Sequence, residues 1–110
     1  MNAYGPPEQI TNTMINVLHD LGFDRWSRDW MRDNWKIWCV FHRRATQMQQ
    51  SGRDYYSART IAEAIRWETD LRETNSVFKV NNDIIPKLAR LYNHLTGSEF
   101  FRLRKQRRAA

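Results

Sequence analysis

The chain has 110 residues, of which 41% are apolar; glycine and proline are scarce, and five residues are tryptophan. This composition excludes a disordered chain and suits one hydrophobic core, and no run approaches the roughly 20 apolar residues that cross a bilayer. The formal charge is +6, and residues 83–110 hold seven Lys/Arg against two Asp/Glu, so nearly all of the surplus lies at one end. A local surplus of this kind favours an anionic partner, with nucleic acid first.

The ends of the chain predict its organisation. Residues 1–6 are expected to form a flexible leader, residues 7–104 a single helical domain, and residues 105–110 a basic tail. The N-terminus lacks the basic start and apolar run of a secretion signal, and Cys39 has no second cysteine with which to form a disulfide. Both features predict a cytoplasmic protein without a membrane segment.

The first predicted helix covers residues 7–21, because Pro7 suits a first helical turn and Gly22 suits a stop. A second helix is predicted over residues 24–50, with Asp24 as its cap, and a break near Asn34 is the alternative. Its large apolar side chains fall on two adjoining arcs, which is unusual for a helix with one buried face. The arcs are Trp26, Trp30, Ile37, Phe41 and Met48, and Met31, Trp35, Trp38 and Cys39.

The second arc has two interpretations. If the other helices cover only one arc, then Met31, Trp35 and Trp38 form a surface for a second copy of the chain or for a host protein. Alternatively, the helix over 24–50 is the central core helix of a small domain.

The second half of the chain predicts two further helices and a pair of strands. Ser57 can cap a helix over residues 57–72, and residues 83–95 repeat apolar positions at helical spacing before Gly97 ends the helix. Residues 77–80 and 100–104 resemble short strands. The predicted fold is mainly α, with about four helices and a small two-stranded β element, and its C-terminal half resembles an elaborated winged helix.

The search for reactive chemistry favours a non-enzymatic protein. His19, His42 and His94 are scattered without partners at ligand spacing, and the chain contains no glycine-rich phosphate loop. Acids in the helix over 57–72 alternate with arginines, as in Glu63 and Arg66, which predicts a solvated, salt-bridged face rather than a metal site. We therefore predict no metal, no cofactor and no enzymatic activity.

The basic residues near the C-terminus define a predicted nucleic-acid site. Asn82, just before the helix over 83–95, and Lys87 and Arg90 within it can approach a DNA groove. The residues predicted to contact phosphates are Arg102, Arg104, Lys105, Arg107 and Arg108. Two plainer interpretations stay open: the basic end is a solubilising tail, and Asn82 is only part of a helix cap.

Four short segments also resemble a known group of proteins. They are residues 65–68 (Ile-Arg-Trp-Glu), 78–82 (Phe-Lys-Val-Asn-Asn), 88–91 (Leu-Ala-Arg-Leu) and 100–102 (Phe-Phe-Arg). Together they resemble the C-terminal half of small phage- and prophage-encoded proteins, over residues 56–104. The resemblance implies a small accessory protein in a bacterial or phage-infected cytoplasm, and it transfers no functional residues.

The sequence thus predicts a DNA-binding accessory or regulatory protein of phage type. The second prediction is an inhibitor or adaptor that binds a host or defence protein through the tryptophan-rich helix over 24–50, with a homodimer as a further form of that interaction.

Overall fold

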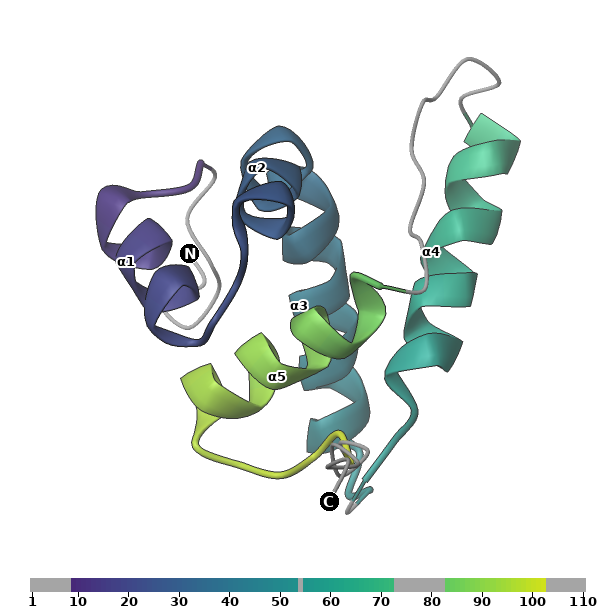
Figure 1. Cartoon of the computed structure of the whole chain (residues 1–110). Coiled ribbons are helices and arrows are strands. Elements are labelled where there is room, and N and C mark those ends of the chain that lie inside the picture. The colour runs from purple at the N-terminus through teal and green to yellow at the C-terminus, as the bar shows by residue number, and fades with distance from the viewer. Residues whose placement is uncertain (1–8, 54, 73–82, 103–110) are drawn as a thin grey trace, which may run out of the picture.

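The computed structural model describes residues 9–53, 55–72 and 83–102, and these residues build five helices (Figure 1). The helices are α1 (Asn12–Asp20), α2 (Arg25–Asp33), α3 (Trp35–Gln50), α4 (Ala58–Arg72) and α5 (Ile85–Thr96). The predicted mainly helical fold is confirmed. The expected leader over 1–6 and basic tail over 105–110 lie outside the described residues.

α1 begins later than its sequence predicts. The Thr11 side-chain oxygen accepts a hydrogen bond from the Met14 backbone N–H at 3.1 Å, which caps the helix at this point. Pro7, on which the earlier start depended, lies outside the described residues. α1 ends at Asp20, and Gly22 turns the chain with a φ of 86°.

The helix predicted over 24–50 is divided at Asn34 into α2 and α3, which is the alternative that the sequence left open. α2 starts at a tight cap, because Asp24 Oδ1 accepts hydrogen bonds from the Ser27 backbone N–H at 2.9 Å and from its hydroxyl at 2.6 Å. At Asn34 the φ is −123°, and the side-chain Nδ2 donates to the Trp30 carbonyl at 3.0 Å. An asparagine that bonds the preceding turn in this way competes with helix continuation.

The ends of α4 and α5 agree with their sequence signals where they are described. The Ser57 hydroxyl accepts from the Thr60 N–H at 3.3 Å and caps α4. α5 carries Pro86 in its first turn and ends at Gly97, whose φ of 65° is left-handed. The predicted cap for α5 is different: Ile84 holds the cap position without a side-chain hydrogen bond.

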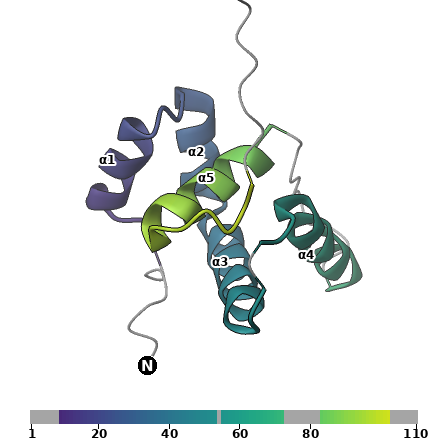
Figure 2. The same ribbon diagram turned by 90° about the horizontal axis from the view of Figure 1, so that it is seen from below.

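α3 is the central element. It contacts α2, α4 and α5, while α1 packs on α2 and α4 packs on α5. Figures 1 and 2 show α1 and α2 on one side of the crossed α3–α5 pair and α4 on the other. This arrangement places α3 in the middle of the fold and explains why Trp35, Trp38 and Phe41, which come from both predicted arcs, are buried.

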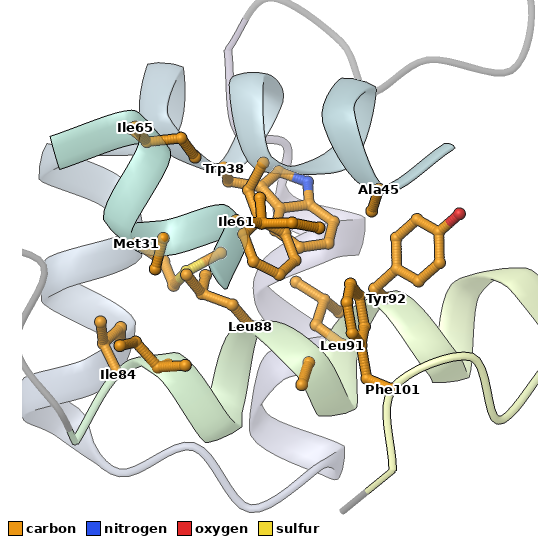
Figure 3. Close-up of a cluster of buried hydrophobic side chains, with 14 of the residues drawn as sticks. Met31, Trp38, Ala45, Ile61, Ile65, Ile84, Leu88, Leu91, Tyr92 and Phe101 are labelled. Carbon is orange, nitrogen blue, oxygen red and sulfur yellow. The ribbon is translucent and has the colours of Figure 1, made fainter. Parts of the chain in front are cut away.

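The core is centred on Trp38, which is fully buried (Figure 3). Its ring stacks on Phe41 with centroids 5.8 Å apart, and Phe41 in turn meets Phe101 at 5.4 Å. Aliphatic side chains from α4 and α5 close the cluster; they are Ile61, Ile65, Ile85, Leu88 and Leu91. Aromatic rings therefore connect α3 with the segment that follows α5.

The predicted two-stranded element is not present in the described residues, which contain no strand. Residues 77–80 and 103–104 lie outside them. Phe101 forms one isolated parallel bridge, and its partner is Tyr56, in the α3–α4 connection. The winged-helix comparison consequently stays a prediction. Phe100 and Phe101 are both buried, so the in-and-out alternation of a strand is broken at this pair.

Candidate functional site

The described part of the chain contains three of the predicted nucleic-acid residues, and it separates them into two places. Lys87 and Arg90 lie half-buried on α5, whereas Arg102 is exposed after it. The others lie outside the described residues; they are Asn82, Arg104, Lys105, Arg107 and Arg108.

The place on α5 is a hollow of about 450 Å³. It is lined by Asp24, Trp26, Asp83, Pro86, Lys87 and Arg90. Hydrogen bonds from Ser27 lower the pKa of the Asp24 carboxyl, and the nearby positive charge of Lys87 lowers it further. Two carboxylates thus share this hollow with two cations, so it is not a simple phosphate pocket.

Arg90 has a structural contact. Its Nη1 donates a hydrogen bond to the Leu21 carbonyl oxygen at 3.1 Å and connects α5 to the turn between α1 and α2. On the same helix, the Asn93 side chain bonds both backbone groups of Phe101: its Nδ2 donates to the carbonyl at 2.7 Å, and its Oδ1 accepts from the N–H at 3.1 Å. Arg90 and Asn93 therefore stabilise the fold through hydrogen bonds to the backbone, a role that the sequence pattern does not indicate.

The second place is formed by Arg53, Tyr55, Tyr56 and Arg102, and we name it the Tyr–Arg surface. The guanidinium carbon of Arg102 lies 4.0 Å from the Tyr55 ring centroid, and that of Arg53 lies 5.3 Å from the Tyr56 centroid. Tyr55 is 54% exposed. Two cation–π pairs thus lie next to each other where the α3–α4 connection meets the segment after α5.

The core holds the Tyr–Arg surface in position. The Tyr56 backbone N–H donates to the Phe100 carbonyl at 3.1 Å, and the two rings are almost parallel, at 8°, with centroids 6.5 Å apart. Phe101 is buried against Tyr92 at 5.3 Å. Both segments that carry this surface are therefore anchored by the residues next to the exposed ones.

Arg53, Tyr55 and Tyr56 were not among the residues predicted from the sequence, because residues 52–56 lie between the two predicted helices over 24–50 and 57–72. A signal was available: two tyrosines stand together after an arginine in a segment without helical or strand periodicity. Aromatic residues in such a segment have no periodic core face to join, which favours a surface role for at least one of them.

The predicted partner surface at Met31, Trp35 and Trp38 needs a correction. Met31 and Trp38 are fully buried and Trp35 is 5% exposed, because α2, which carries Met31, packs on α3, and α4 and α5 also contact α3. These side chains belong to the core, which was the alternative interpretation. Among the tryptophans whose side chains the structure describes, Trp26 on α2 is the exposed one, at 46%.

The reactive side chains that the structure describes have ordinary surroundings. The predicted ion pair of Glu63 and Arg66 is present at 3.4 Å on the exposed side of α4. Burial raises the pKa of the Cys39 thiol, which disfavours the thiolate needed for nucleophilic attack. Within residues 9–53, 55–72 and 83–102, no three His, Cys, Asp or Glu side chains gather as metal ligands. In the same residues, no helix combines the length and apolarity required to span a membrane.

Comparisons of the chain with protein-family models, with curated proteins and with solved structures found no match. The resemblance of residues 56–104 to small phage proteins therefore stays a prediction.

Proposed function

We propose that the chain is a non-enzymatic nucleic-acid-binding protein, an accessory or regulatory protein of phage type that acts in the bacterial cytoplasm and binds DNA in preference to RNA. Its contact surface is the Tyr–Arg surface together with the basic residues that follow it. The observation that carries the proposal is Arg102, held 4.0 Å over the exposed ring of Tyr55. A cation next to an open aromatic ring offers both a phosphate contact and a stacking face.

The charge distribution supports the same location. Arg102 opens a run with Arg104, Lys105, Arg107 and Arg108, which gives five basic residues and no acid over residues 102–108. Each phosphate that such a run neutralises releases counterions, so affinity falls with salt at a log–log slope of about −0.9 per contact on a duplex.

The burial of α5 favours this surface over a groove-reading helix. Five of its twelve residues are buried, and Arg90 already donates to Leu21. Lys87 keeps an exposed part, yet it lies beside Asp24 and Asp83, which repel phosphate. A recognition helix needs one open face of groups that read bases, and α5 offers only a narrow one.

The test is a titration of labelled DNA by fluorescence anisotropy at low and physiological salt. Reversal of both charges on the surface, Arg53→Glu with Arg102→Glu, is expected to weaken binding at low salt by about tenfold or more, since phosphate contacts dominate affinity. Arg25→Glu with Arg43→Glu is the matched control, because it also reverses two exposed arginines, on α2 and α3, and is expected to change affinity little.

Equal losses in this double variant and in the Arg25→Glu, Arg43→Glu control would contradict this location, because they would indicate a general effect of net charge. Absence of wild-type binding at low salt would contradict the function itself. Circular dichroism of each variant verifies that the helices are intact.

A second candidate function is the binding of a protein partner, and Trp26 favours it. This ring is 46% exposed and forms one wall of the hollow that also contains Asp24 and Lys87. A large aromatic side chain next to charges of both signs suits a protein interface. In the DNA titration, Trp26→Leu is expected to leave affinity unchanged, because Trp26 lines the hollow and is not part of the Tyr–Arg surface.

A further inference from the structure

Tyr55 and Tyr56 are adjacent, yet they have opposite surroundings. Tyr56 is half-buried and stacks on Phe100, whereas Tyr55 is exposed and contacts Arg102. Tyr56 belongs to a bridge, and neighbouring side chains in extended backbone point to opposite sides. The pair thus presents one ring to the core and one to the solvent.

The exposed pair is held in advance of any ligand. Tyr55 precedes a residue whose backbone N–H is bonded to Phe100, and Arg102 follows Phe101, whose two backbone groups are bonded by Asn93. Little conformational freedom therefore remains in the backbone to be lost on binding. A preorganised surface of this kind binds more tightly than the same side chains on a free segment.

From this arrangement we infer that the Tyr55–Arg102 pair stacks on an unpaired nucleobase, so that the chain prefers single-stranded nucleic acid to duplex. The inference rests on the proposed function and specifies its ligand. In a duplex both faces of a base are covered by its neighbours, and only an unpaired base offers a face to a ring or to a guanidinium plane.

The local charge agrees with a ligand that is recognised through stacking. In the sequence, Arg53 and Arg102 are balanced by Asp54 and Glu99, so the positive surplus comes from residues 104–108, which hold four basic residues and no acid. This positive surplus attracts a phosphate chain without distinguishing strand forms. The preference for single-stranded over duplex nucleic acid must then come from the ring of Tyr55.

The experiment compares the full chain and its variants on labelled oligo(dU), oligo(U) and a blunt-ended duplex without a loop, all of equal charge. Tyr55→Leu is expected to weaken binding to the single strands by about tenfold, since one stacked base is lost, and to change duplex binding by less than about twofold. Tyr55→Trp keeps a stacking face and is expected to retain wild-type affinity. Trp26→Leu is the matched control, because it removes an exposed ring elsewhere.

A wild-type preference for either single strand, lost in Tyr55→Leu and kept in Tyr55→Trp, supports the inference; the stronger of oligo(dU) and oligo(U) identifies the sugar. Equal wild-type affinity for strand and duplex, or an unchanged Tyr55→Leu, would overturn the inference while salt-dependent binding leaves the proposed function standing. No binding to any of the three probes at low salt would overturn both.

Discussion

His42 lies between two aromatic rings of the core. Its ring centroid is 5.7 Å from that of Trp38 and 5.5 Å from that of Tyr92. Burial lowers the pKa of His42 below its ordinary value of 6.5, because the charged imidazolium loses hydration there. The folded protein therefore holds this imidazole neutral at pH values where the unfolded chain would protonate it.

Because of His42, we predict that the stability of the folded protein depends on pH. The unfolded chain binds more protons than the folded one below pH 6.5, so the free energy of unfolding is greatest above that pH and falls as the pH decreases. Urea unfolding at pH 7.5 and at pH 5.5 measures the loss, and His42→Gln is expected to reduce it. His94→Gln, at an exposed position on α5, is the control and should keep the wild-type difference.

For single residues, the sequence shows which side chains are apolar but not which of them are exposed to solvent. It identified Met31, Trp35 and Trp38 as a shared arc, but which neighbours cover an arc depends on helices far away in the chain. The break at Asn34 adds to the difficulty, because it reorients α3 relative to α2. The exposure of Tyr55 depends on the bridge at Tyr56, for which the local sequence contains no periodic signal.

Among the elements, the segment after α5 depends most on a single side chain. Asn93 satisfies both the N–H and the carbonyl of Phe101, whose side chain is buried in the core. Backbone groups left without partners in such a place cost free energy. The Asn93 amide thus supplies the two backbone hydrogen bonds that a neighbouring β-strand would otherwise supply.

Replacing that amide is expected to loosen the segment. Asn93→Ala should lower the free energy of unfolding by about 2 kcal/mol, since two backbone groups lose their partners, partly offset by the better helix propensity of alanine. Urea denaturation measures the change, with Asn16→Ala on the exposed side of α1 as the control. A loss no greater than that of the control would contradict the assigned role.

The sequence predicts element ends where a cap is chemically specific. Ser57 and Gly97 correctly indicated the start of α4 and the end of α5, because a hydroxyl cap and a left-handed residue act locally. The predicted start of α1 at residue 7 was wrong, because the helix begins after Thr11, which caps it. The pairing of Phe101 with Tyr56 joins distant segments, and local patterns carry no information on such a choice.

At the scale of the whole molecule, Arg90 connects parts of the chain that are 69 positions apart. Its bond to Leu21 links the turn after α1 to α5, while α1 otherwise packs mainly on α2. This contact lies at the border of the hollow with Trp26. This hydrogen bond therefore helps to hold the α1–α2 pair against α5.

Arg90→Met keeps the aliphatic stem and removes the hydrogen bond, so it is expected to reduce the free energy of unfolding by about 1 kcal/mol. Lys87→Met is the matched control on the same face of α5 and is expected to cost less. Both are measured by urea denaturation, and DNA titration of the folded variants follows. A large loss of DNA affinity in Arg90→Met at unchanged stability would contradict this structural role and indicate that Arg90 contacts DNA.

The paired phenylalanines after α5 also affect the order in which the molecule can fold. Phe100 and Phe101 complete the aromatic cluster that contains Phe41 and Tyr92. The ribosome makes α1, α2 and α3 first, and during that time the rings of Trp38 and Phe41 lack the partners that cover them. Closure of the core must wait until Phe100 and Phe101 have been synthesised, so the nascent chain exposes an apolar aromatic helix that chaperones can recognise.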